Sequence, residues 1–396
     1  MIGDRIEGDL ISINKSLLPL SWLYGLGVGF RNILFDTGIL KSRSFTVPVI
    51  SVGNITVGGT GKTPHVEYLI QLLKDRAKVA VLSRGYKRKS HGFVLADERS
   101  KVNDIGDEPF QMKTKFPDIT VAVDKKRARG IDHLTSGEYV KDIDIILLDD
   151  AYQHRYVKPG INILLVDYHR LVIYDTLLPA GRLREPVKSK DRADIVIVTK
   201  CPKDLKPMEF RVITKAMNLY PYQQLFFSTH EFEALRQVFL ENQEHLRLSA
   251  LADQHVLLLT GIASPEQMLT ELQAYAKEVT PLAFSDHHAF SKKDVERINN
   301  TFSTLPSPKL IVTTEKDETR LLQVEGLSDE VRNSLYVLPI RIQILLNQEE
   351  LFNQTIISYV RKNSRNSILA KMPDDHKSKD SHRPGDRPRT ISFRNN

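Results

Sequence analysis

The residues best suited to chemistry form a glycine-rich turn that runs into Lys62 and Thr63. The turn contains Gly58, Gly59 and Gly61, and glycines let backbone N–H groups come close to phosphate oxygens. Lys62 can then reach the β- and γ-phosphates of a nucleotide, and the Thr63 hydroxyl can bind Mg²⁺. The pattern predicts a phosphate-binding loop, and the alternative is a glycine-rich turn with a solvent-exposed lysine.

The segments on both sides of the turn are those of a P-loop, in which a strand leads into the loop and a helix follows it. An apolar run over residues 49–52 predicts a buried strand, and the helical spacing of apolar residues after Pro64 predicts the helix. One position departs from the strict motif. Thr56 stands where the first glycine is expected, which leaves the conformation at the start of the loop open. The predicted nucleotide-binding residues are Thr56, Val57, Gly58, Gly59, Thr60, Gly61, Lys62 and Thr63.

Acidic pairs occur at two further places where chemistry could take place. An apolar run over residues 143–148 ends in Asp149 and Asp150, which is the Walker B arrangement. Mg²⁺ is the natural partner of buried acids at such a position. Asp107 and Glu108 open another predicted helix. There they could serve only as a cap and dipole partner, or one could act as a base while the other binds metal.

Apolar, strand-like runs alternate with helical stretches between residues 46 and 199. This alternation predicts an α/β fold of the P-loop NTPase type, with a mostly parallel sheet and helices on both faces. Ligands bind at the carboxyl ends of strands in such sheets, and several of the polar clusters fall at those ends. The predicted strands cover residues 49–52, 79–82, 119–123, 143–148, 161–166 and 195–198.

The chain divides into four predicted regions. They are an N-terminal segment over 1–45, a P-loop core over 46–200, a smaller α/β lobe over 201–362 that completes the cleft, and a disordered basic tail over 363–396. An uncharged run over 17–30 is shorter than the ~20 apolar residues that cross a bilayer. With Trp22, Tyr24 and Phe30 it predicts a helix that lies in a membrane interface, and a buried N-terminal helix is the alternative.

Composition excludes some classes of protein. The single cysteine, Cys201, rules out a disulfide framework and a cysteine-based zinc site, and a cytoplasmic address is the simplest interpretation. The net charge of +7 comes mainly from residues 361–396, which hold ten Lys/Arg and four Asp/Glu. The remaining 360 residues carry 46 basic and 45 acidic groups, so the body of the protein lacks the basic character of a nucleic-acid-binding domain.

Six short motifs then occur in order along the chain. They are Val-Gly-Asn-Ile-Thr-Val-Gly-Gly-Thr-Gly-Lys-Thr (52–63), Ser-Arg-Gly-Tyr-Lys-Arg (83–88), Gly-Asp-Glu-Pro (106–109), Leu-Asp-Asp-Ala-Tyr-Gln-His (148–154), Leu-Arg-Glu-Pro (183–186) and Asp-His-His (286–288). Through this combination the chain closely resembles the tetraacyldisaccharide 4′-kinases, the lipid A 4′-kinases of Gram-negative bacteria, from the apolar N-terminal segment to about residue 360. One departure, Ala151-Tyr152 in place of Gly-Phe, is expected to alter local packing and not chemistry.

The resemblance implies an ATP-dependent lipid kinase with ATP and Mg²⁺ as cofactors. Its substrate would be an acylated glucosamine disaccharide 1-phosphate in the cytoplasmic leaflet of the bacterial inner membrane, and the γ-phosphate of ATP would pass to the 4′-hydroxyl. The product would be the 1,4′-bisphosphate, lipid IVA, of lipid A biosynthesis. A substrate of this kind favours the membrane-docked helix over the buried one. No nucleic-acid or protein partner is expected.

The resemblance also implies roles for single residues. Lys62 would hold the phosphates, and Asp107 would accept the proton of the 4′-hydroxyl with His287 beside it as a dyad. Whether His287 or His288 acts is left open. The implied magnesium-binding residues, or their immediate neighbours, are Thr63, Glu108, Asp149, Asp150 and Glu185. The implied phosphate or sugar contacts are Arg84, Tyr86, Arg127 and Arg184.

Two other functions compete with the kinase. The first is a P-loop ATPase or GTPase that couples hydrolysis to a protein partner at the membrane, which would turn over without a lipid acceptor. The second is a non-catalytic peripheral membrane protein that only binds nucleotide, for which Asp107 would be dispensable. The sequence favours the kinase, because the motifs at 106–109 and 286–288 have no evident role in the other two.

Overall fold

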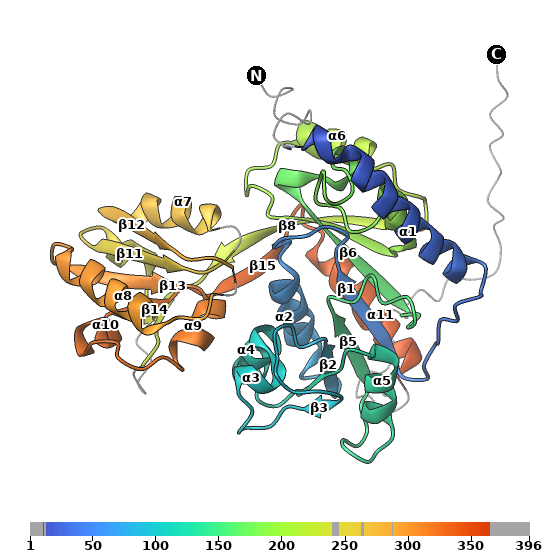
Figure 1. The fold of residues 1–396 in the computed structure, drawn as a ribbon, viewed down its shortest axis with the longest axis horizontal. Helices are drawn as coiled ribbons and strands as arrows, with labels where there is room; N and C mark the ends of the chain where they lie inside the picture. Colours follow the sequence, from blue (N-terminus) through green and yellow to red (C-terminus); the bar gives the residue numbers. More distant parts are fainter. Residues whose placement is uncertain (1–10, 12, 240–244, 263–264, 287, 365–396) are drawn as a thin grey trace, which may run out of the picture.

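The computed structural model describes residues 11, 13–239, 245–262, 265–286 and 288–364, which form two lobes (Figure 1). The first lobe contains a nine-stranded sheet in the order β15-β8-β7-β6-β1-β5-β2-β4-β3. Its strands are β1 (Val49–Gly53), β2 (Val79–Ser83), β3 (Val94–Leu95), β4 (Thr120–Val123), β5 (Ile145–Asp149), β6 (Ile161–Asp167), β7 (Ile195–Thr199), β8 (Gln224–Phe232) and β15 (Ile340–Ile344). Only the edge strands β3 and β15 pair antiparallel, so the sheet is mostly parallel, and all six predicted strands are confirmed.

Helices cover both faces of this sheet because successive strand residues point to opposite sides. In β6, Ile163 and Leu165 join one core while Leu164 and Val166 join another. The first core is closed by α2 (Lys62–Leu73), α4 (Asp107–Lys115) and α11 (Glu349–Asn363). The opposite face is covered by α5 (Arg127–Thr135) and α6 (Pro207–Met217). The short helix α3 (Val102–Ile105) precedes α4.

The second lobe is smaller and has its own cores. Its six-stranded sheet runs in the order β10-β9-β14-β13-β11-β12. The strands are β9 (Leu235–Gln237), β10 (His245–Leu246), β11 (His255–Thr260), β12 (Glu278–Ala283), β13 (Lys309–Thr313) and β14 (Leu335–Val337). The helices are α7 (Glu266–Tyr275), α8 (Lys292–Thr304), α9 (Glu315–Leu321) and α10 (Asp329–Asn333).

The boundary between the lobes differs from the one predicted after residue 200. The chain continues from β7 through α6 into β8, which pairs with β7, and it enters the second lobe only after Phe232. It returns at β15, which pairs with β8, and α11 then packs on the first sheet. Local sequence patterns cannot reveal this arrangement, because the pairing of β8 with β15 joins segments more than a hundred residues apart.

The N-terminal helix α1 (Leu18–Asp36) lies on the outside of the first lobe (Figure 1). Within the described part of the chain, no helix has the length and hydrophobicity that a membrane crossing requires. The first ten residues of the predicted N-terminal segment lie outside the described residues. Positions 365–396 of the predicted disordered tail do so as well.

Candidate active site

The glycine-rich turn lies between β1 and α2, as predicted. Gly58 and Gly61 have φ angles of +108° and +78°, values that favour glycine. Thr56 needs no such freedom, because it forms an antiparallel bridge with Leu183, and the N–H of Val57 donates to Arg182 O at 2.8 Å. The threonine at the first-glycine position is therefore explained by an extended backbone that pairs with the Leu-Arg-Glu-Pro segment.

Side chains beneath the turn hold its shape. The amide of Asn54 donates to Thr60 Oγ1 at 2.9 Å, and Thr199 Oγ1 donates to Thr60 O at 3.1 Å. His65 lies with Nδ1 2.7 Å from Gly61 O and Nε2 2.9 Å from Ser228 Oγ, and burial lowers its pKa to about 4. The ring is therefore neutral, with its proton on Nδ1 to donate to the carbonyl. Asn54 and His65 are not among the residues predicted from the sequence to form the site.

A cavity of about 470 Å³ lies between the two lobes and is lined by residues of both. Gly59, Thr60, Gly61, Lys62, Thr63 and Glu108 are its lining residues from the turn, α2 and α4. Ile262, Met268 and Lys316 are among those from the second lobe. This volume is in the range of small-molecule and cofactor sites. Part of the predicted phosphate-binding turn, with Lys62 and Thr63, therefore faces one space with Glu108, whereas Asp107 is not among the residues that line this cavity.

Asp149, at the end of β5, is a buried acid with an unsatisfied oxygen. It is 1% exposed, and Ser83 Oγ donates to its Oδ2 at 3.0 Å. Its Oδ1 has no hydrogen-bond partner among the described residues. Burial, followed by the charges of Glu108 and Asp150, raises the pKa of Asp149 to about 7. A cation bound at this point would give Oδ1 a partner and would offset the buried negative charge.

Asp150 has the opposite environment. Lys62 Nζ lies 3.8 Å and Arg184 Nη2 lies 3.2 Å from its Oδ1. Burial acts to raise the pKa of Asp150, but the charges of Lys62 and Arg184 outweigh it, and the net shift is downward. Its φ of +44° is a left-handed value, which asparagine and aspartate tolerate better than most residues. The two adjacent acids of the Walker B segment therefore have opposite pKa shifts, upward for Asp149 and downward for Asp150.

The residues present fit a magnesium ion that is shared with a nucleotide. Among the described residues, no three His, Cys, Asp or Glu side chains form a ready cluster for a metal. Mg²⁺ commonly takes one or two carboxylates and completes its shell with phosphate oxygens and water, so a closed protein cage is not needed. Asp149 Oδ1 and the Thr63 hydroxyl are the donors best suited to this role. Glu185 is bound instead by Arg192 through Oε2, although its buried Oε1 has no described partner.

Asp107 begins α4 and contacts the second lobe. Arg320 of α9 donates to Asp107 Oδ2 from Nη2 at 2.6 Å and from Nε at 3.1 Å. His287, predicted to act beside Asp107, lies outside the described residues. His288 is engaged elsewhere, since its Nε2 lies 3.0 Å from Asp294 Oδ2 and its ring stacks on Phe284. Of the two histidines, His288 is therefore committed to the start of α8.

The predicted phosphate or sugar contacts differ in their surroundings. Arg84 and Tyr86 are exposed after β2, and their loop packs closely on the start of α4. A Cβ on Gly106 would lie 2.8 Å from Tyr86 O. Arg127 is only 2% exposed and donates to Asp149 O at 3.0 Å, so its guanidinium braces the end of β5 and faces no open space. Its position does not fit a direct substrate contact.

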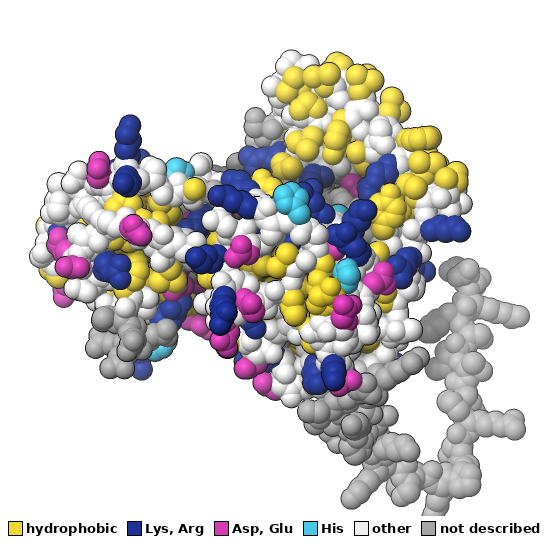
Figure 2. All heavy atoms as spheres, turned by 60° about the horizontal axis from the view of Figure 1, so that its bottom comes forward, with side chains coloured by type: hydrophobic (Ala, Val, Ile, Leu, Met, Phe, Trp, Pro, Cys, Tyr) yellow, Lys and Arg dark blue, Asp and Glu magenta, His cyan; other side chains and the backbone are white. Residues whose placement is uncertain are grey.

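Helix α1 is attached to the same region. The Tyr24 hydroxyl donates to Arg184 O at 2.9 Å, and Ser21 Oγ accepts from the N–H of Ala180 at 2.9 Å. The outward side of the helix is apolar, with Trp22 72% exposed and Leu26 71% exposed. Leu23, Phe30 and Ile33 are exposed beside them. Figure 2 shows hydrophobic side chains gathered on the first lobe, next to several Lys and Arg side chains.

Comparisons with known proteins show which family the chain resembles. The model of the family described as tetraacyldisaccharide-1-P 4′-kinase matches residues 13–361. A tetraacyldisaccharide 4′-kinase of Phocaeicola vulgatus is 58% identical over 363 residues, covering 91% of this chain and 99% of the relative. One from Bacteroides thetaiotaomicron is 56% identical over 383 residues, covering 94% and 100%. The crystal structure of LpxK from Aquifex aeolicus in complex with ATP matches with a TM-score of 0.67 and 32% identity, covering 88% of this chain and 99% of that one.

Proposed function

Since this chain belongs to the tetraacyldisaccharide 4′-kinase family, we infer that the cleft between its lobes transfers the γ-phosphate of ATP to the 4′-hydroxyl of a tetraacyldisaccharide 1-phosphate. The chain is an ATP-dependent kinase of lipid A biosynthesis, and its product is the 1,4′-bisphosphate. The observation that most directly supports the cleft as the site is that Lys62, Thr63 and Glu108 line one cavity.

ATP would bind with its phosphates on the backbone amides of the turn and the start of α2. Lys62, which lines the cavity, would contact the β- and γ-phosphates, and its Nζ lies 3.8 Å from Asp150 Oδ1. Thr63 and Asp149 would hold Mg²⁺, with Glu108 and Asp150 close to it. When bound, the ion neutralises charge on the β- and γ-phosphates.

Asp107 would act as the base for the acceptor. As the 4′-oxygen forms its bond to the γ-phosphorus, the O–H proton passes to the Asp107 carboxylate. The bond from the γ-phosphorus to the bridging oxygen breaks, and ADP leaves with the electron pair. Arg320 donates two hydrogen bonds to one oxygen of Asp107, and these bonds hold the carboxylate in one orientation. Transfer of this kind depends mainly on position and charge.

The lipid acceptor would reach the cleft from a membrane surface. The exposed loop of Arg84 and Tyr86 packs on the start of α4, where it could contact the sugar phosphate head. Helix α1 would place Trp22, Leu26 and Phe30 in the interface of the cytoplasmic leaflet of the inner membrane. Through Tyr24 and Arg184 this helix is joined to the segment that contacts Asp150.

A transfer assay tests the reaction. Purified protein is incubated with Mg²⁺, γ-labelled ATP and tetraacyldisaccharide 1-phosphate in detergent, and label in the lipid is measured. We expect the wild type to label the lipid, and Lys62→Ala and Asp107→Ala to lose about 10³-fold in rate. Lys78→Ala is the control, because Lys78 is exposed and paired with Asp142. Release of labelled phosphate by the wild type with no label in the lipid would support the hydrolase alternative.

Vesicle binding tests the membrane contact separately. Sedimentation with phosphatidylethanolamine and phosphatidylglycerol vesicles is compared for the wild type and for Trp22→Ser/Leu26→Ser/Phe30→Ser. We expect at least ~30-fold weaker binding for the triple variant, because three large side chains no longer enter the interface. Leu351→Ser, an exposed leucine of α11, is the matched control. Equal binding of the triple variant and the control would contradict the docking role of α1.

A further inference from the structure

The start of α9 carries a buried carboxylate, Asp317, whose described hydrogen bonds all come from the second lobe. Asp317 is 0% exposed. Its Oδ2 accepts from the N–H of Gly261 and from Thr314 Oγ1, each at 2.8 Å. Gly261 follows β11 and Thr314 follows β13, so two parallel strands end at this one side chain. Asp317 is therefore fixed by the sheet of the second lobe.

Asp317 in turn fixes the guanidinium of Arg320. Arg320 Nη1 donates to Asp317 Oδ1 at 2.8 Å and lies 3.3 Å from Gly261 O. A Cβ at Gly261 would come within 2.9 Å of Asp317 Oδ1, so a larger residue there would displace the Asp317 carboxylate. A guanidinium is planar and presents its donors in fixed directions. Holding Nη1 therefore sets where Nη2 and Nε point.

The other edge of the guanidinium meets the first lobe. Nη2 and Nε both donate to Asp107 Oδ2, at 2.6 and 3.1 Å, and both side chains are mostly buried. Charge-assisted hydrogen bonds of this length are strong and directional. One arginine thus connects a carboxylate built into the second sheet with the acid that begins α4.

We propose that Arg320 is a positioning residue for the transfer, which orients the Asp107 carboxylate towards the acceptor hydroxyl when the second lobe lies against the first. This inference rests on the proposed function of Asp107 as the base. Under this proposal, the Asp107 carboxylate is correctly aligned only while Arg320, which Asp317 holds in place, contacts it across the two lobes.

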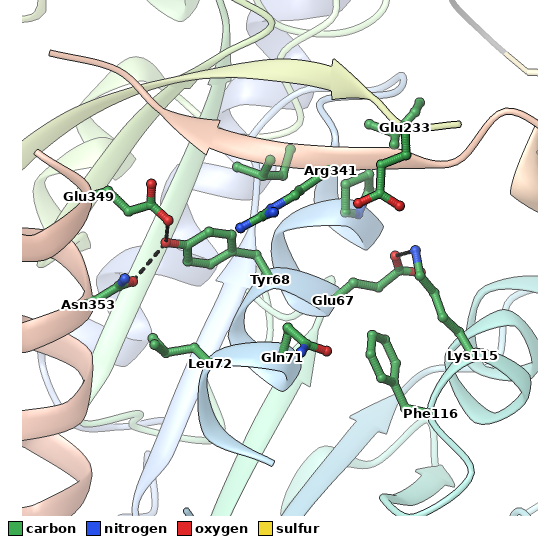
Figure 3. A pocket seen from close by; sticks show the side chains of 13 residues that line it. Glu67, Tyr68, Gln71, Leu72, Lys115, Phe116, Glu233, Arg341, Glu349 and Asn353 are labelled. Carbon is green, nitrogen blue, oxygen red and sulfur yellow. Dashed lines mark hydrogen bonds and ion pairs between the residues drawn. The ribbon is translucent and has the colours of Figure 1, made fainter. Parts of the chain in front are cut away.

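Attachment of the lobes alone does not require Arg320. Lys115 of α4 lies 2.7 Å from Glu315 of α9 and 2.7 Å from Glu67 of α2, so a second ion pair joins the same two helices. Figure 3 shows Lys115 and Glu67 joined at one side of a cavity next to α2. This pair contacts neither Asp107 nor Arg320 through any described bond. It offers a matched control in which interlobe attachment is weakened and the base is left untouched.

The test compares Arg320→Met, Arg320→Lys and Lys115→Met in the lipid transfer assay. We expect Arg320→Met to lower kcat by ~30- to 100-fold while KM for ATP stays within about threefold, because a misplaced base slows the step without weakening nucleotide binding. Arg320→Lys keeps the charge but cannot contact both carboxylates in one plane, so an intermediate loss of about tenfold is expected. The kcat of Lys115→Met should stay within about threefold of the wild type, because Lys115 is bonded to Glu67 and Glu315 and not to Asp107.

A double variant separates positioning from general damage. If Arg320 acts only through Asp107, then Arg320→Met should lower the residual rate of Asp107→Ala by no more than about twofold. A full additional loss in that background would overturn the proposal, as would equal kcat losses in Arg320→Met and Lys115→Met. Should Arg320→Met fail to fold by circular dichroism, Arg320→Lys decides, and its unchanged kcat would overturn the proposal. A wild type that fails to label the lipid would instead count against the proposed function.

Discussion

Asp149 and Asp317 are both fully buried carboxylates at the carboxyl ends of parallel strands, one in each lobe, and they differ in what surrounds them. Asp317 receives hydrogen bonds from Gly261, Thr314 and Arg320 on both oxygens. Asp149 receives one, from Ser83, and its Oδ1 has no described partner. A buried acid that is fully bonded by its own chain belongs to the framework, whereas one that is half bonded is suited to a ligand that the chain does not supply.

Of the variants proposed here, those of Asp149 should have the largest effect, and this effect should be a loss of activity. We expect Asp149→Asn to lower kcat by ~10³-fold, equivalent to about 4 kcal/mol, because a ligand for the magnesium ion is lost. Without nucleotide, the thermal midpoint at pH 8 should stay the same or rise, since an uncompensated buried charge has been removed. Lipid labelling and thermal denaturation measure the two quantities. A marked loss of stability would show that Asp149 is part of the framework.

Replacing Asp317 should lower stability, whereas replacing Asp149 should lower activity. Asp317→Asn leaves the Arg320 guanidinium without one of its buried carboxylates, and the free energy of unfolding should fall by about 3 kcal/mol. Chemical denaturation measures this loss. Glu318→Gln is the control, because Glu318 also forms an ion pair on α9, with Arg236 at 2.7 Å. An Asp317→Asn variant as stable as the wild type would remove the distinction between Asp149 and Asp317.

Ligand binding offers a third comparison. With MgATP at 100 times its Kd, the wild type should gain about 2.7 kcal/mol of stability. Asp317→Asn should gain a similar amount, while Asp149→Asn should gain clearly less. Thermal shifts with ATP alone and with MgATP separate the contribution of the ion. The same gain in all three proteins would argue that Asp149 does not hold the metal.

The stability of the protein at low pH should depend on His230, a buried residue that lines the cleft. Burial, followed by the charge of Lys200, lowers the pKa of His230 to about 4, and its Nε2 has no described partner. Since the unfolded state then takes up a proton first, stability is present above pH ~6.5 and is lost as pH falls towards 4. Between pH 6.5 and 5 this residue should account for about 1.5 kcal/mol. His230→Gln should lessen the slope of unfolding free energy against pH, and His91→Gln, an exposed histidine, should not.

Much of the first lobe could be predicted because its signals are local. The strand before the turn, the glycines and Lys62 are contiguous, and each strand of the parallel sheet is a short apolar run. The extended backbone at Thr56 could not be predicted, because its cause is pairing with Leu183. The burial of Arg127 could not be predicted for a related reason, since its partner is a carbonyl at the end of β5.

The second lobe was harder to interpret because its contribution depends on tertiary contacts. Nothing local in the sequence connects Arg320 with Asp107, 213 positions earlier. The pairing of β8 with β15 is similarly non-local, and it moved the boundary between the lobes. Functional residues contributed by the strand ends of one sheet are therefore easier to find than those contributed across a cleft.

The return of the chain through β15 has a consequence for biosynthesis. Phe352 and Ile356 of α11 complete a core that also contains Val66 and Ile70 of α2. During translation this core must wait until all of the inserted lobe has left the ribosome, because β15 and α11 are made after it. A nascent chain halted before Ile340 would leave the helix behind the glycine turn without its apolar cover. Such an arrest product would be a natural client for chaperones.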